Sequence, residues 1–247
     1  MSTEGMALTA LAAAAILAGC ATPVPWRITP GEYRHSVSKE ITRKAGYTFL
    51  LFVPSEGRKA GTRWPLLIFL HGSGERGDQL DQVKVHGPLA YAGKNNFPFL
   101  VAAPQAPHET RWSEDGLKVM LDEIIARAPV DTDRVYVTGL SMGGEGTWNF
   151  ACEYPELIAA IVPVCGRTDP SRAHRLRDVP VRAFHGEKDP IVPVFWSRAM
   201  VDAVKAAGGD ATLTVDPDAG HDSWTAAYND PAVYEWLLRQ KKRRGGP

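Results

Sequence analysis

The chain has 247 residues, a length that a single α/β domain commonly occupies. Its hydrophobic fraction of 44% and charged fraction of 23% are ordinary for a protein with a packed core, and they argue against a disordered or fibrous chain. Basic and acidic residues number 28 each, so the formal net charge is zero and gives no reason to expect nucleic acid as a partner. We therefore expect a neutral or small substrate.

The N-terminal segment has the features of a targeting signal. Leu8–Ala18 is apolar, long enough for a signal-peptide core and too short to span a membrane. The run then closes in Leu17-Ala18-Gly19-Cys20, which resembles the lipobox of bacterial lipoproteins. We expect cleavage before Cys20, a lipid on that cysteine and export to a bacterial envelope. Because Met1–Met6 contains no basic residue, a cytoplasmic protein with an N-terminal helix is the alternative.

These signals divide the chain into four segments. We expect a signal peptide over residues 1–20, a tether and N-terminal segment over 21–44, one folded domain over 45–240 and a disordered tail over 241–247. The tail holds the basic run Lys241–Arg244 beside Gly-Gly-Pro, a composition typical of a frayed terminus rather than of a binding patch.

Short apolar runs follow one another along the predicted domain. Several are apolar almost throughout, as expected for parallel strands covered by helices on both faces. The predicted strands are Tyr47–Pro54, Leu66–Leu70, Phe99–Pro104, Arg134–Gly139, Ala159–Val164, Val181–His185 and Ala211–Val215.

Helical segments alternate with these strands. In the clearest one, Leu117–Ile125, apolar residues recur at the helical spacing until Pro129 ends the pattern. The alternation predicts an α/β domain with a mostly parallel, doubly wound sheet. Three further predicted helices are Ser141–Tyr154, Val194–Ala207 and Val233–Gln240.

The sequence Gly139-Leu140-Ser141-Met142-Gly143 has the form G-x-S-x-G between a predicted strand and a predicted helix. In this context the serine lies on a sharp turn, and the glycines avoid steric conflict around it. The N-terminus of the following helix also favours developing negative charge. Ser141 is therefore the candidate nucleophile.

A serine hydroxyl needs a base to remove its proton and a carboxylate to orient that base. Three histidines follow Ser141. His174 lies in an arginine-rich connection and His185 ends a strand, so both are interpreted as structural. His221 lies in a turn after the last predicted strand, where a loop can reach the nucleophile, and it is the candidate base.

The carboxylate is expected at the end of the strand that precedes the histidine loop. Asp189 lies in the exit loop of Val181–His185 and is favoured over Glu187, because Pro190 fixes the turn there. Asp216 and Asp218 remain alternatives, since both are close to His221 in sequence.

Two backbone N–H groups are expected to stabilise the tetrahedral oxyanion. One belongs to Met142, the residue after the nucleophile. The other is expected from Ser73 in the glycine-rich loop His71–Gly77, which follows a predicted strand directly.

Four runs together resemble the α/β-hydrolase superfamily, and more narrowly its feruloyl-esterase, polyhydroxybutyrate-depolymerase and dienelactone-hydrolase-like branch. Members of this branch are often labelled predicted peptidases or carboxylesterase-like proteins. The resemblance covers about residues 45–240 and implies Ser141 as nucleophile, Asp189 as acid and His221 as base. The runs are His71–Gly77, Thr138–Gly144 with Trp148, His185–Asp189 with Val192-Pro193, and Gly220–Trp224.

The predicted activity is serine-dependent hydrolysis of carboxylic esters through an acyl-enzyme. Short-chain, aryl and carbohydrate-linked esters, free or attached to a polymer, are the expected substrates. A serine peptidase of the prolyl-oligopeptidase type is the alternative, and a binding module without activity is disfavoured by the intact set of residues. A dienelactone hydrolase in the strict sense would have cysteine in place of Ser141.

We expect an open site, because Gly166–Val179 is too short to hold a cap domain between two strands. Trp112 and Trp224 are candidates to line the site, with ordinary packing as the alternative.

The mechanism needs no metal or organic cofactor. Cys152 and Cys165 lack the spacing of a zinc site and are expected to be buried, although an exported protein could pair them.

Overall fold

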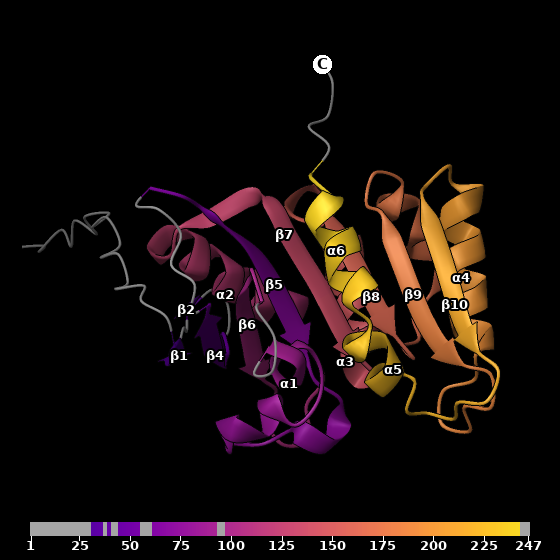
Figure 1. The fold of residues 1–247 in the computed structure, drawn as a ribbon, viewed down its shortest axis with the longest axis horizontal. Helices are drawn as coiled ribbons and strands as arrows, with labels where there is room; N and C mark the ends of the chain where they lie inside the picture. The colour runs from indigo at the N-terminus through magenta and orange to yellow at the C-terminus, as the bar shows by residue number, and fades with distance from the viewer. Residues whose placement is uncertain (1–30, 37–38, 41–43, 55–60, 93–96, 243–247) are drawn as a thin grey trace, which may run out of the picture.

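The computed structural model describes residues 31–36, 39–40, 44–54, 61–92 and 97–242. The predicted signal peptide, Cys20 and the last five residues of the predicted tail lie outside these ranges. The described residues form a sheet of eight strands with helices packed against it (Figure 1). The α/β fold class predicted from the sequence is confirmed.

The sheet is mixed, with the strand order β1-β4-β6-β5-β7-β8-β9-β10. The pairs β1–β4 and β4–β6 are antiparallel, whereas the strands from β6 to β10 run parallel to one another. The carboxyl ends of the parallel strands therefore meet at one edge, where α/β proteins place their sites. The strands are β1 (Gly31–Ser36), β4 (Thr48–Val53), β5 (Trp64–Leu70), β6 (Leu100–Gln105), β7 (Val130–Leu140), β8 (Ala160–Val164), β9 (Val181–Gly186) and β10 (Ala211–Asp216), while β2 (Lys39–Glu40) and β3 (Lys44–Ala45) form a separate pair.

Helices cover both faces of the sheet. The buried side chains of α2, α3 and α4 belong to one core cluster, and those of α1, α5 and α6 belong to the other. Figure 1 shows α6 in front of the sheet. No helix in the described ranges is long and apolar enough to cross a membrane. The helices are α1 (Pro88–Ala92), α2 (Glu114–Arg127), α3 (Met142–Glu153), α4 (Phe195–Ala206), α5 (Trp224–Asn229) and α6 (Pro231–Arg239).

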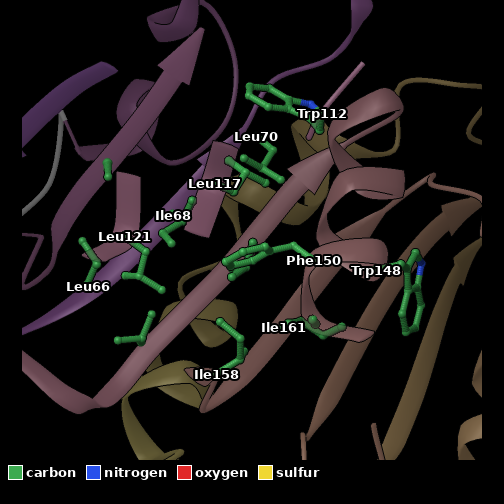
Figure 2. Close-up of a cluster of buried hydrophobic side chains, with 14 of the residues drawn as sticks. Leu66, Ile68, Leu70, Trp112, Leu117, Leu121, Trp148, Phe150, Ile158 and Ile161 are labelled. Atoms are coloured by element: carbon green, nitrogen blue, oxygen red, sulfur yellow. The ribbon is translucent and has the colours of Figure 1, made fainter. Parts of the chain in front are cut away.

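Strand β5 shows why both faces must be covered. All of its residues are buried, and alternate side chains point to opposite faces. Leu66, Ile68 and Leu70 belong to the cluster with α2 and α3 (Figure 2), whereas Leu67 and Phe69 belong to the cluster on the other face. A strand that is apolar throughout is stable in water only when both faces are packed.

The folded domain differs from the predicted one at both ends. Residues 21–44, predicted to hold the tether and an N-terminal segment, contain β1, which pairs with β4 at the edge of the main sheet. Strand β1 has few apolar residues because it pairs on one side only, so its sequence lacks the apolar run of an inner strand. At the other end, the backbone N–H of Lys242 donates to the carbonyl oxygen of Asp133 at 2.8 Å. The start of the predicted tail is therefore held against β7.

The connection between β8 and β9 is short, as expected. Its secondary structure is the 3-10 helix η4 (Pro170–Leu176), and this connection holds no cap domain. Cys152 and Cys165 are buried and free, so the expectation of buried thiols is confirmed and the two do not pair.

Candidate active site

Ser141 lies at a strained turn between β7 and α3. Its φ is 53° and its ψ is −115°, a conformation that costs a residue with a side chain on the order of 1–3 kcal/mol. A Cβ atom at Gly143 would lie 1.8 Å from the carbonyl oxygen of Leu70, and one at Gly139 would lie 2.4 Å from the carbonyl oxygen of Gly143. Both glycines of the motif are therefore required by the contact of α3 with β5 and β7.

Three side chains from three loops form one line of hydrogen bonds at the carboxyl edge of the sheet. His221 Nε2 lies 2.9 Å from Ser141 Oγ, and His221 Nδ1 lies 2.7 Å from Asp189 Oδ2. Because a carboxylate only accepts, Nδ1 carries the proton and Nε2 is free to accept the serine proton. Asp189 follows β9, and His221 follows β10.

Asp189 is fixed from two sides. Its Oδ1 accepts the backbone N–H groups of Ile191 at 2.8 Å and Val192 at 2.9 Å, while its Oδ2 accepts from His221. Burial alone would raise the pKa of the Asp189 carboxyl, but the hydrogen bonds from His221, Val192 and Ile191 outweigh it and lower the pKa. The carboxylate is therefore ionised at neutral pH and held toward the imidazole.

The alternative acids are engaged elsewhere. Asp216 Oδ1 accepts the backbone N–H of Asp218 and of Ala219, so it shapes the loop that carries His221. Asp218 pairs with Lys188 at 2.8 Å. Glu187 likewise pairs with Arg198. The structure brings Asp189, and none of these three, to His221.

His185, which we interpreted from the sequence as structural, contacts the same carboxylate. Its Nε2 lies 2.7 Å from the carbonyl oxygen of Val192 and 3.2 Å from Asp189 Oδ2, and its Nδ1 lies 2.7 Å from Ser197 Oγ. The ring is buried. The position of His185, four residues before Asp189 at the end of the same strand, is the sequence signal that could have indicated this contact.

Both candidate oxyanion residues line the cleft that contains Ser141. Met142 begins α3, so its backbone N–H has no acceptor within the helix. Ser73 begins the 3-10 helix η1 (Ser73–Glu75) after β5. The structure thus brings these two residues together with Ser141.

The loop that carries Ser73 is held by buried polar groups. His71 Nδ1 lies 2.5 Å from the carbonyl oxygen of Gly72, and His71 Nε2 accepts the backbone N–H of Ala106 at 3.0 Å. The side-chain amide of Gln105 donates to the carbonyl oxygen of Glu75 at 2.8 Å. These bonds fix the loop to the end of β6, and no sequence pattern had indicated Gln105.

The two candidate tryptophans are placed differently from the expectation. Trp112 is buried in the core, and its Nε1 donates to the carbonyl oxygen of His71 at 3.2 Å. This hydrogen bond supports the loop that carries Ser73, and Trp112 is not among the residues that line the cleft. Trp224 is half-buried, and its ring meets the ring of His221 edge-on at 5.3 Å between centroids. It contacts the candidate base but is not among the residues that line the cleft.

The cleft at Ser141 has a volume of about 340 Å³ and is lined by several charged side chains. Glu145, one turn along α3 from Ser141, accepts from Arg111 at 2.9 Å and lies 3.6 Å from Arg167. The sequence did not indicate this group, because its members come from separate connections and carry no local motif. The charged residues are Arg76, Glu109, Arg111, Glu145 and Arg167.

One group of potential metal ligands occurs among the described residues. Ligand atoms of Cys165, Asp189 and His221 lie within 4.8 Å of one another. Burial raises the pKa of the Cys165 thiol to about 12, which disfavours the thiolate that a metal would need. Asp189 and His221 already bond to each other, so this donor set fits a hydrogen-bonded site better than a metal site.

Known proteins share the family and the fold of this chain. Residues 105–236, more than half of the chain, match the dienelactone hydrolase family. A solved structure described as a thermostable esterase superimposes with a TM-score of 0.74 and 30% identity, covering 85% of this chain and 63% of that one.

Two curated relatives carry esterase names. NocK from Nocardia uniformis subsp. tsuyamanensis, named as an esterase, is 27% identical over 52% of this chain and 41% of its own length. The bifunctional acetylxylan esterase/xylanase XynS20E from Neocallimastix patriciarum is 27% identical over 52% of this chain and 20% of its own length. The chain therefore matches less than half of the length of these relatives. The family and these names support a hydrolase that acts on esters.

The burial of His71 predicts a pH-dependent stability. Burial lowers the pKa of its imidazole to about 4, below the value near 6.5 of an unfolded chain. Neutral His71 thus contributes stability that is fully present above pH 6.5 and is lost as the pH falls through about 4. From pH 7 to pH 4, we expect the free energy of unfolding to fall by about 3 kcal/mol more in the wild type than in His71→Gln. Urea denaturation at both pH values measures the difference, and equal losses in the two proteins would refute it.

Proposed function

The chain belongs to the dienelactone hydrolase family of the α/β-hydrolase superfamily, and on that premise we propose that it is a serine-dependent carboxylic ester hydrolase acting through an acyl-enzyme. The observation that carries the proposal is the line of hydrogen bonds from Ser141 through His221 to Asp189. A hydroxyl, an imidazole in the correct tautomer and an ionised carboxylate are the parts that this chemistry needs.

The mechanism follows from these positions. Ser141 Oγ attacks the ester carbonyl carbon while His221 Nε2 takes the serine proton, and Asp189 stabilises the imidazolium. The resulting oxyanion accepts hydrogen bonds from the backbone N–H groups of Met142 and Ser73. The intermediate then collapses, the alcohol leaves with the proton from His221, and an acyl group remains on Ser141. Water, deprotonated by His221, attacks this acyl-enzyme, and the carboxylic acid is released as the serine is restored.

We propose short-chain, aryl or carbohydrate-linked esters as the substrate classes. The open cleft at Ser141 and the short connection between β8 and β9 support substrates of varied shape. Peptide hydrolysis is the competing activity for the same triad. One purified sample tested with p-nitrophenyl esters, cinnamoyl esters, acetylated sugars and peptide anilides distinguishes the two, and cleavage of anilides but not of esters would contradict the proposal.

Removal of the nucleophile tests the proposed chemistry. We expect Ser141→Ala to lose roughly 10³-fold or more of kcat for p-nitrophenyl acetate, because no other group accepts the acyl chain. Circular dichroism should be unchanged, since alanine is smaller than serine at this turn. Ser171→Ala, at an exposed serine of η4, is the matched control and should keep wild-type turnover. A Ser141→Ala preparation that retains ordinary turnover would contradict the mechanism.

We also propose that the chain is exported and anchored by lipid at Cys20. The support is the apolar run and the lipobox-like tetrad, both outside the described residues. In a bacterial host, the wild type and Cys152→Ser should incorporate radioactive palmitate and fractionate with membranes, because several acyl chains hold a protein firmly. Cys20→Ser should do neither. Equal fractionation of all three proteins without label would refute the anchor.

A further inference from the structure

A second cavity lies beside the cleft of Ser141. It has a volume of about 420 Å³ and shares Glu145 and Arg167 with that cleft. A molecule whose reacting carbonyl is placed at Ser141 can therefore extend into the second cavity past these two side chains. None of Ser141, Asp189 and His221 lines the second cavity, so it takes no part in the bond-breaking steps.

The charges around the second cavity are balanced. Glu145 and Asp169 contribute two carboxylates, and Arg167 and Arg172 contribute two guanidinium groups. Arg172 in turn pairs with Glu153 at 2.7 Å, outside the lining. A site with equal numbers of acids and bases, each with hydrogen-bonding atoms, suits a neutral polar ligand better than an anion or a cation.

The remaining lining adds an aromatic ring and an oriented amide. Trp196, half-buried in the first turn of α4, is the aromatic residue of the lining. Among the other lining residues, Thr168 Oγ1 donates to Asn149 Oδ1 at 2.5 Å. The amide oxygen of Asn149 is thereby occupied, which leaves its NH₂ group available as a donor.

We propose that this cavity binds the sugar ring of a carbohydrate ester that is cleaved at Ser141. A sugar ring is neutral, carries several hydroxyl groups that both donate and accept, and has an apolar C–H face that packs on an aromatic ring. The neutrality of the sugar matches the balanced charges of the cavity. Its hydroxyl groups can bond to the amide of Asn149, and its apolar face can pack on the ring of Trp196. The inference rests on the proposed ester hydrolysis and narrows its substrate class.

A comparison of two substrates tests the subsite. Acetylated xylotriose needs the second cavity, whereas the leaving group of p-nitrophenyl acetate carries no sugar. The measured quantity is kcat/KM for acetylated xylotriose divided by kcat/KM for p-nitrophenyl acetate. We expect this ratio to fall about tenfold in Trp196→Ala, because one aromatic contact with the sugar is lost. Trp236→Ala is the matched control and should leave the ratio unchanged, because Trp236 is likewise half-buried, packs against the core cluster on the other face of the sheet and does not line the cavity.

Binding measured without turnover separates this proposal from the proposed function. By calorimetry, Ser141→Ala should bind xylotriose, and Ser141→Ala with Trp196→Ala should bind it at least about tenfold more weakly. An unchanged substrate ratio in Trp196→Ala, or equal binding by the two proteins, would overturn the subsite. A wild type inactive on p-nitrophenyl acetate would instead refute the proposed function, and the calorimetric comparison would still decide the subsite.

A separate observation concerns His185, behind the triad. Burial lowers the pKa of this imidazole, so the ring is neutral near pH 7. Its Nε2 faces the carbonyl oxygen of Val192 at 2.7 Å, which places the single proton on Nε2 and leaves Nδ1 to accept from the hydroxyl of Ser197. Besides this bond, Nε2 lies 3.2 Å from Asp189 Oδ2, the oxygen that bonds to His221.

We infer that His185, aligned by Ser197, is a positioning residue that holds Asp189 Oδ2 toward His221. The His185 N–H donates to the carbonyl oxygen of Val192, and the N–H of Val192 donates to Asp189 Oδ1, so His185 restricts rotation of the carboxylate through Val192 as well as by its own approach to Oδ2. Both partners are buried, so no water is expected to replace either group. Loss of this contact should slow the proton transfer without altering how the substrate binds.

Ser197→Ala tests this role with little change in volume. We expect kcat to fall about tenfold with KM within about twofold, the pattern of an interaction that acts in the transition state. The far-downfield proton resonance of the His221–Asp189 hydrogen bond should move upfield. In His185→Gln, whose amide retains an N–H donor, kcat should exceed that of His185→Leu.

Tyr228→Phe is the control for loss of a buried hydroxyl, since Tyr228 bonds to Thr138 at 2.9 Å and not to the triad. It should keep kcat and the resonance at their wild-type values. The positioning role would be overturned by a Ser197→Ala protein with an unmoved resonance, or by equal kcat in the glutamine and leucine variants of His185.

Discussion

The close packing of α3 against β5 is the constraint on which the rest of the site depends. The backbone of Gly143 meets the carbonyl of Leu70 at a distance that leaves no space for a side chain. This contact holds the first turn of α3 at the carboxyl edge of the sheet and forces Ser141 into its positive φ. The side chain of Ser141 therefore projects from the turn into the cleft, and the adjoining N–H of Met142 lies beside it. Strain at one residue is sustained by the packing of two elements around it.

The parallel strands then supply the remaining groups at the same edge. Asp189 follows β9, His221 follows β10 and Ser73 follows β5, so residues far apart in sequence meet because their strands end together. The loop after β9 is fixed by hydrogen bonds to the Asp189 carboxylate, which makes one side chain both a structural anchor of its loop and the partner of His221. This double use explains how an exposed loop can hold a carboxylate within hydrogen-bonding distance of the imidazole.

The features that the sequence predicted were those with a local signal. Inner strands such as β5 are apolar throughout, and the elbow at Ser141 has glycines that its own backbone requires. Strand β1 escaped prediction because it pairs with β4 alone at the edge of the sheet and lacks the apolar run of an inner strand. The sequence left Trp112 open between the cleft and ordinary packing, because no local feature of an aromatic residue distinguishes a residue that lines a site from one that supports it. The contact of His185 with Asp189 had a signal in their four-residue spacing, which sequence reasoning did not use. The charged group around Glu145 depends on how separate loops fold over the edge, which no spacing along the chain encodes.

The central claim is that Ser141 forms a covalent acyl-enzyme with the help of His221. Reaction with a fluorophosphonate, followed by mass spectrometry of the intact protein and of its peptides, tests that claim most directly. The account predicts one phosphonyl adduct per chain, located on Ser141, and loss of labelling in Ser141→Ala. A protein that hydrolyses esters while taking up no adduct, or that carries the adduct on a residue other than Ser141, would contradict it.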